Sequence, residues 1–158
     1  MSIEIEHKFL LLNDTWRNEV SHSCYYQQGY MSSLPTSSIR VRTANEHAWL
    51  NIKSATIGNQ RHEYEYPIPL EDAQEMLQNL CQKPLVIKTR HFILRQQHTW
   101  EIDEFHGDND GLIIAEIELS SAEEAFDKPS WLGAEVTQDL RYYNNNLSKH
   151  PYKEWHNI

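Results

Sequence analysis

Charged and apolar residues alternate along several stretches of this chain, and this alternation restricts the fold more than any other feature. Successive side chains of a β-strand point to opposite faces of the sheet, so charges at every second position share one face. The charges with this spacing are Glu4, Glu6 and Lys8; Arg40 and Arg42; Glu63 and Glu65; Lys88 and Arg90; Glu101 and Asp103; and Glu116 and Glu118. Apolar residues fill most of the positions between them, so the pattern predicts a mainly β chain whose strands carry one charged and one apolar face.

Turn-forming residues divide the alternating stretches into eight expected strands. The expected strands are Ile3–Leu11, Tyr25–Met31, Ser38–Thr43, Ala48–Ser54, His62–Ile68, Val86–Arg95, Thr99–Phe105 and Leu112–Leu119. Because most connections between them are short, we expect an antiparallel sheet closed into an eight-stranded barrel or tunnel.

Two helices are expected to flank this sheet, which makes the fold α+β. Apolar residues recur at helical spacing from Leu70 to Leu80, with Glu71 and Asp72 in the first turn where the helix dipole favours acids. A second helix is expected over Gln138–Leu147, with Thr137 as its N-cap.

Composition favours a single domain spanning residues 1–158, because 39% of the 158 residues are hydrophobic. No apolar run reaches the roughly 18 residues of a membrane helix, and the start does not resemble a signal peptide. Two cysteines, Cys24 and Cys81, are too few for a disulfide framework, so we expect a cytoplasmic protein. The net charge of −9 argues against a nucleic-acid partner, while the apolar strand faces leave room for a homodimer.

The charged strand faces have two interpretations: a solvated outer surface, or the lumen of a barrel wide enough for water and ligands. Segregation of the two signs onto different strands favours the lumen. The basic residues suit a polyanion; they are Lys8, Arg40, Arg42, Lys53, Lys88 and Arg90. The carboxylates would repel that polyanion unless divalent metal ions lay between them, and oxygen-only ligands favour Mg²⁺ or Mn²⁺. Nine histidines do not indicate zinc, because neither HExxH nor CxxC occurs. We therefore expect metal-dependent chemistry on a phosphate chain.

The opening Glu4-Ile5-Glu6-His7-Lys8 resembles the ExExK signature of the triphosphate tunnel metalloenzymes, the CYTH superfamily. The later charges follow the family order: Arg40 and Arg42, Lys53, Glu63 and Glu65, Lys88 and Arg90, Asp103, then Glu116 and Glu118. The closing segment from Glu135 to Tyr142 is similar to the EVT-x-D-x-R-Y ending of the small bacterial inorganic triphosphatases of that family. Together these matches extend from residue 3 to residue 147.

The resemblance implies a tunnel that binds a triphosphate with a divalent metal ion. Phosphoryl transfer depends mainly on positioning and charge neutralisation. The residues expected to bind phosphate are Lys8, Arg40, Arg42, Lys53, Lys88 and Arg90. The expected metal ligands are Glu4, Glu6, Asp103, Glu116 and Glu118. Lys8 is expected to meet the leaving-group oxygen, and Glu63 or Glu118 to act on the attacking water.

The expected activity is hydrolysis of inorganic tripolyphosphate to phosphate and pyrophosphate, a phosphoric anhydride hydrolase reaction. Three alternatives stay open: an adenylyl cyclase, a thiamine triphosphatase, and a module that binds polyphosphate without turnover. The sequence contains no element that demands a purine pocket, which disfavours the cyclase. Four acidic residues would have little purpose in a binding module.

Overall fold

The computed structural model describes residues 5–34, 36–55 and 62–155. Its described strands are all antiparallel and form one nine-stranded sheet in the order β5-β4-β3-β2-β6-β7-β8-β1-β9. The strands are β1 (Ile5–Leu11), β2 (His22–Ser33), β3 (Ser37–Ala44), β4 (His47–Ser54), β5 (Glu63–Pro67), β6 (Val86–Arg95), β7 (His98–His106), β8 (Ile113–Leu119) and β9 (Leu132–Glu135). The prediction of a mainly β antiparallel fold is therefore confirmed.

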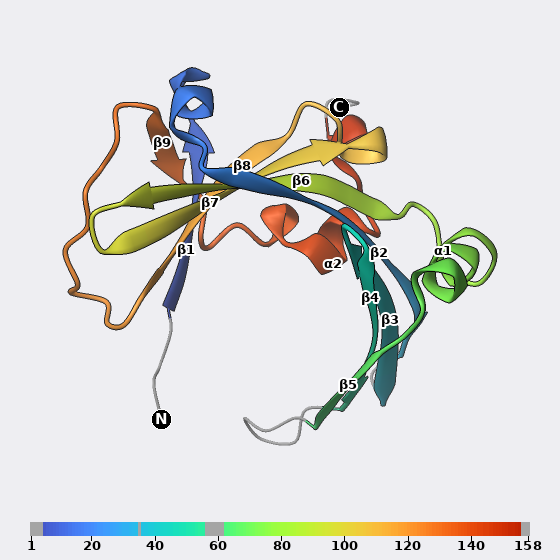
Figure 1. Cartoon of the computed structure of the whole chain (residues 1–158). Helices are drawn as coiled ribbons and strands as arrows, with labels where there is room; N and C mark the ends of the chain where they lie inside the picture. Colours follow the sequence, from blue (N-terminus) through green and yellow to red (C-terminus); the bar gives the residue numbers. More distant parts are fainter. Residues whose placement is uncertain (1–4, 35, 56–61, 156–158) are drawn as a thin grey trace.

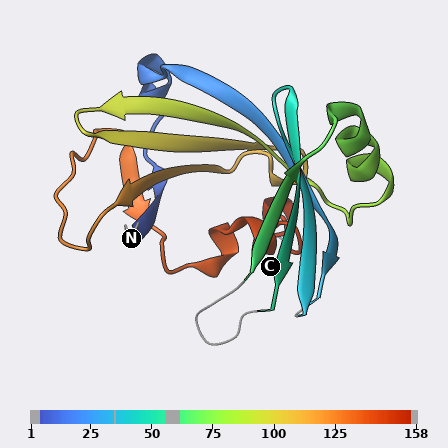
Figure 2. The same cartoon turned by 60° about the horizontal axis from the view of Figure 1, so that its bottom comes forward.

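The sheet is strongly curved but not closed, because β5 and β9 are its two edges. Figure 1 shows it as an arch with the C-terminal segment lying inside the curve, and Figure 2 shows the same arrangement from another side. Eight strands correspond to the expected ones. The ninth, β9, pairs with β1 and was not predicted, because its four residues carry no alternating pattern.

The helices are short and lie on opposite sides of the sheet. They are α1 (Leu70–Asn79), α2 (Asn144–Leu147) and the 3-10 helices η1 (Thr15–Glu19), η2 (Gly107–Asn109), η3 (Leu140–Tyr142) and η4 (Tyr152–Glu154). Helix α1 buries Ala73 and Leu77 against the outer face of β3 and β4, and Leu80 lies beyond its end, 60% exposed. None of the described helices is long and apolar enough to cross a membrane.

The continuous helix predicted over Gln138–Leu147 is wrong. The chain instead forms η3 and α2, separated by Tyr143 in an extended conformation (φ −91°, ψ 145°). Thr137 is not an N-cap: its hydroxyl accepts from the Lys8 backbone N–H, and Asp139 caps η3 by accepting from the Arg141 N–H. Tertiary contacts to β1 thus override the local helical preference of this segment.

The apolar strand faces pack outward, away from the interior of the arch. The larger core covers the outer face of β1, β6, β7 and β8, where Trp16 of η1 and the loop residue Trp131 are fully buried. A second core closes one end of the inner face, where Val86, Phe105 and Ile114 meet Leu147 of α2. The remaining inner face is polar and charged, so the alternation in the sequence separates the core from the interior of the arch.

Candidate functional site

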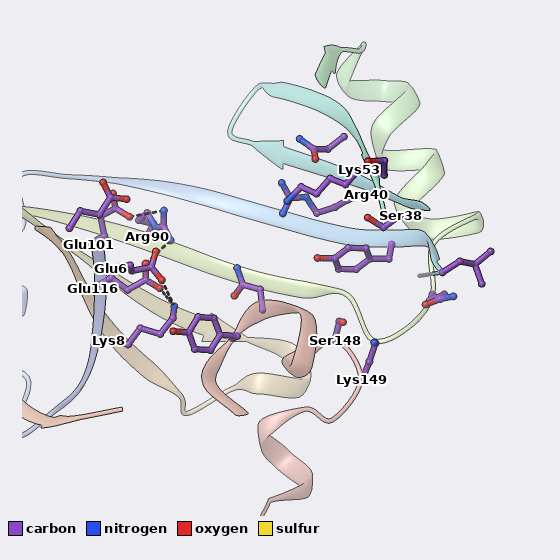
Figure 3. A pocket seen from close by; sticks show the side chains of 18 residues that line it. Glu6, Lys8, Ser38, Arg40, Lys53, Arg90, Glu101, Glu116, Ser148 and Lys149 are labelled. Atoms are coloured by element: carbon purple, nitrogen blue, oxygen red, sulfur yellow. Dashed lines mark hydrogen bonds and ion pairs between the residues drawn. The ribbon is translucent and has the colours of Figure 1, made fainter. Parts of the chain in front are cut away.

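A cavity of about 560 Å³ lies inside the arch, and basic, acidic and neutral polar side chains form almost all of its lining. Figure 3 shows Glu6, Lys8, Arg90, Glu101 and Glu116 gathered on one side and Ser38, Arg40 and Lys53 on the other. The lining residues are the bases Lys8, Arg40, Lys53, Arg90 and Lys149; the acids Glu6, Glu101, Glu116 and Glu118; the neutral polar residues Tyr30, Ser38, Asn51, Ser54, Gln82, Tyr143, Asn144 and Ser148; and Leu34.

Lys8 is the buried centre of one side of this cavity. Strand register places it opposite Glu116 and places Glu6 opposite Glu118, so β1 and β8 bring these four side chains together. The Lys8 ammonium is ion-paired with Glu116 and lies 3.2 Å from Glu6 Oε1, while the whole residue is only 5% exposed. Burial alone would lower the pKa of Lys8, but Glu116 and Glu6 raise it above its usual value. Lys8 therefore remains a cation in the cavity wall.

Arg90 is held in place by the acids of the neighbouring strand β7. Asp103 lies opposite it in register and accepts two hydrogen bonds from its guanidinium, at 2.7 and 2.9 Å. Lys88 Nζ donates to the same carboxylate at 2.8 Å. Burial would raise the pKa of Asp103, but Lys88 and Arg90 hold it well below its usual range. Asp103 is fully buried, so its charge serves Lys88 and Arg90.

Arg90 also links the acids on either side of it into one network. Its Nη1 lies 2.7 Å from Glu101 Oε2, and its Nη2 lies 3.8 Å from Glu116 Oε2. The pKa of Glu101 is raised above its usual value, mainly by burial. Arg90 opposes this rise, and the nearby charge of Glu116 adds to it. The ion pairs thus run without a break from Lys88 through Asp103, Arg90 and Glu116 to Lys8.

The opposite side of the cavity, on β3 and β4, is built differently. Arg40 lies between Tyr30 and Asn51 in the register of the sheet. Within the described part of the chain, the Nε atoms of Arg40 and Arg42 are buried without a hydrogen-bond acceptor. Arg42 does not line the cavity; its guanidinium lies 5.1 Å from the ring centre of Trp49. A buried guanidinium donor without an acceptor is costly, and a bound anion would satisfy it.

Asn51 connects this side to the acids of the edge strand. Its Nδ2 donates to Glu65 at 2.8 Å and to Glu63 at 3.2 Å, and the residue is 2% exposed. Glu63 and Glu65 themselves are exposed and are not among the residues that line the cavity.

The structure brings most of the expected site residues together. Those that line the cavity are Glu6, Lys8, Arg40, Lys53, Arg90, Glu116 and Glu118. Lys88 and Asp103 lie behind Arg90, Arg42 lies against Trp49, and Glu4 is outside the described residues. His7 and His91 bind Glu135 and Glu104 instead, on the opposite face of their strands from Lys8 and Arg90.

Sequence reasoning missed several cavity residues. Alternation placed Glu101 on one charged face with Asp103, but Glu101 was not among the expected phosphate-binding or metal-binding residues. Asn51 lies between Arg40 and Glu65 in the register of the sheet and carries no charge signal of its own. Tyr143, Ser148 and Lys149 come from the C-terminal segment, whose path into the arch has no periodic signature.

The acids of the cavity fit a divalent metal ion in donor chemistry. Glu6, Glu116 and Glu118 offer only oxygen ligands, which suit hard cations. In the described residues, no group of three or more acidic, His or Cys side chains is arranged as a metal centre. Glu6 and Glu116 converge on the Lys8 ammonium instead, which shows that their carboxylates can share one cation.

Comparison with known proteins identifies consistent relatives. A family profile described as "CYTH domain" matches residues 2–152. The chain is 44% identical to the inorganic triphosphatase of Acetivibrio thermocellus, over 98% of this chain and 99% of that protein. It is 37% identical to the inorganic triphosphatase of Nitrosomonas europaea, over 92% and 96% of the two chains. A crystal structure described as that of an inorganic triphosphatase superposes with a TM-score of 0.75 at 33% identity, covering 94% of this chain and 95% of the other.

Proposed function

The chain belongs to the CYTH family, and we propose that it hydrolyses inorganic tripolyphosphate to phosphate and pyrophosphate with the help of a divalent metal ion. The observation that carries this proposal is the cavity inside the arch, where bases and acids from facing strands meet. The two relatives named inorganic triphosphatase, each matched over more than nine-tenths of both chains, support it. We also propose that residues 1–158 act as one domain, since one sheet contains all the described strands.

In this proposal the bases bind the phosphate chain from two sides. Arg40 and Arg90 offer planar guanidinium groups for bidentate contact, and Lys8 and Lys53 act as point charges. Lys88 and Asp103 hold Arg90 in position from behind, so we assign them support rather than contact with substrate or metal. Arg42 lies beyond the cavity, against Trp49, and would reach only a longer anion.

Glu6, Glu116 and Glu118, with Glu4, are the residues that would hold the metal, and Mg²⁺ or Mn²⁺ suits their oxygens. A bound divalent ion supplies charge neutralisation for the phosphate oxygens and makes a bound water more acidic. The chain itself contributes the orientation of these carboxylates through the paired strands β1 and β8.

Proton handling falls to residues close to the phosphate chain. We propose that Glu118, which lines the cavity, orients the attacking water, and we keep Glu63 as the alternative because Asn51 holds it near the same side as Arg40. Lys8 is the buried ammonium best placed to neutralise the leaving oxygen.

A substrate and metal panel tests the proposal. Phosphate release is measured from tripolyphosphate, thiamine triphosphate and ATP with magnesium, manganese, calcium or excess chelator. We expect the highest kcat/KM with tripolyphosphate, since charged and polar side chains form almost the whole lining and suit a bare phosphate chain better than an organic group. We also expect no turnover in chelator and weaker turnover with calcium, whose looser coordination positions the reactants less well.

Three results would contradict the proposal. Full turnover in chelator would exclude metal dependence, and cyclic AMP with pyrophosphate from ATP would identify a cyclase. Tight binding of tripolyphosphate without hydrolysis would identify a binding module. Lys153→Ala serves as the control variant, because Lys153 pairs with Asp108 away from the cavity and its side chain is 59% exposed.

A further inference from the structure

The closing segment Glu135–Tyr142 and the residue after it, Tyr143, pack around one residue of the cavity, Lys8. The Val136 N–H donates to the Lys8 carbonyl at 2.8 Å. The Lys8 N–H donates to Thr137 Oγ1 at 3.0 Å. This segment therefore binds both main-chain polar groups of Lys8. On its other side, Lys8 pairs with Glu116 of β8, so its Cα is held from both sides.

The same segment also reaches the far end of the Lys8 side chain. The Lys8 ammonium lies 4.6 Å from the ring centre of Tyr143, and Tyr143 lines the cavity. The Tyr143 hydroxyl donates to the Thr137 carbonyl at 2.9 Å, so the ring is attached to the residue that binds the Lys8 main chain. The extended conformation of Tyr143, which interrupts the expected helix, is what turns its ring toward Lys8.

An aromatic ring supports an ammonium differently from a carboxylate. The face of the ring attracts the cation but carries no lone pair and no net charge that would repel a phosphate. Glu6 and Glu116, the charged partners of Lys8, are also the residues that would bind the metal in the proposed function. Contact with the Tyr143 ring would remain when those carboxylates turn to another cation. It would also limit the rotamers of a long, flexible side chain.

We propose that Tyr143 is a positioning residue whose ring holds the Lys8 ammonium in the cavity, the hydroxyl bond to Thr137 being a secondary support. This inference adds a residue role to the proposed hydrolysis, and its kinetic test rests on that proposed function. It assigns a purpose to the closing motif, which none of the proposed phosphate and metal contacts uses.

The test compares Tyr143→Phe, which keeps the ring, with Tyr143→Leu, which removes it. Tyr142→Leu is the matched control, because the neighbouring Tyr142 packs on Trp155 at 5.1 Å and does not line the cavity. We expect Tyr143→Leu to lower kcat at least about tenfold, while KM for tripolyphosphate changes less than about threefold because other bases still bind it. Tyr143→Phe should keep kcat within about threefold of the parent. Tyr142→Leu should lower Tm and leave kcat intact.

A second measurement does not depend on turnover. Proton NMR of the Lys8 ε-methylene should show an upfield ring-current shift in the parent and in Tyr143→Phe, and lose it in Tyr143→Leu. If the parent shows this shift but no hydrolysis, the proposed function fails while the contact stands. Absence of the shift in the parent would overturn the inference. A normal kcat in Tyr143→Leu would also overturn it. The same holds if Tyr143→Leu and Tyr142→Leu lose kcat in the same proportion to their loss of Tm.

Discussion

The two sides of the cavity differ in how their charges are satisfied. On the wall formed by β1, β6, β7 and β8, here called the paired wall, Lys8, Lys88 and Arg90 each have carboxylate partners. On the wall formed by β3 and β4, the buried Nε of Arg40 has no acceptor within the described residues. The paired wall is therefore complete without a ligand, whereas the β3–β4 wall still has hydrogen-bonding capacity for an anion.

This difference predicts which residues couple function to stability. Removing one partner from a buried ion pair leaves an uncompensated charge, which is strongly destabilising. Removing a buried donor that has no acceptor relieves a desolvation cost. Substitutions of the buried ion-paired residues Lys8, Lys88, Arg90 and Asp103 should thus affect folding and activity together, and substitution of Arg40 should affect activity alone.

The largest effect is expected at Asp103. Asp103→Asn leaves Lys88 and Arg90 facing each other without their shared carboxylate, and should lower the free energy of unfolding by about 3–5 kcal/mol. Urea unfolding measures it. Asp108→Asn is the control, because Asp108 pairs with Lys153 at the surface and should change stability by less than about 0.5 kcal/mol. Equal effects at the two positions would show that the paired wall is not held together by its charges.

The next effect belongs to the β3–β4 wall. Arg40→Lys keeps the charge but loses the planar guanidinium, so kcat/KM for tripolyphosphate should fall about 100-fold, or about 2.7 kcal/mol. Its Tm should stay unchanged or rise, because the orphaned Nε is gone. Steady-state kinetics and thermal unfolding measure the two quantities. A large drop in Tm would mean that Arg40 is part of the folding framework after all.

Two acids on β8 sharpen the comparison within one strand. Glu116 is buried against Lys8, whereas Glu118, two residues later, is exposed. Without metal, Glu116→Gln should destabilise the protein by about 2 kcal/mol, and Glu118→Gln should leave it as stable as the parent. Magnesium at 100 times its Kd stabilises a folded binder by about 2.7 kcal/mol, and Glu118→Gln should lose most of that gain. A destabilised Glu118→Gln with the parent's response to magnesium would remove Glu118 from the metal site.

The smallest effect is expected on the outer face, at Glu104. Hydrogen bonds from Arg17 and His91 lower the pKa of Glu104 from 4.5 to about 2. Since the folded-state pKa is the lower one, this stabilisation is present above pH 4.5 and is lost as the pH falls toward 2. Glu104→Gln should cost about 1 kcal/mol at pH 7 and almost nothing near pH 2, with kcat unchanged. A constant cost across this range would mean that the ion pair does not contribute.

Much of the fold follows from short-range pattern. Val86–Arg95 is a strand over the predicted residues, and α1 begins at Leu70 as its apolar spacing indicates. The inner-face assignment of Lys8, Arg40 and Arg90 also follows, because alternation alone decides which side chains share a face. The break at Tyr143 and the added strand β9 depend on contacts with β1, more than 120 residues away in the chain, and local sequence carries no record of them.

The sequence by itself determined that this chain forms an antiparallel sheet with one charged face, and which residues lie on that face. Only the tertiary structure decided which of those charges pair. Lys8 meets Glu116 across 108 positions of sequence, and Asp103 is buried in ion pairs with Lys88 and Arg90 because β6 and β7 pair in that register. The physical reason is the difference between local interactions within a strand and interactions between strands that are distant in sequence. Side-chain alternation is a property of each strand, whereas an ion pair depends on the register between strands and on the exclusion of water from the space between them.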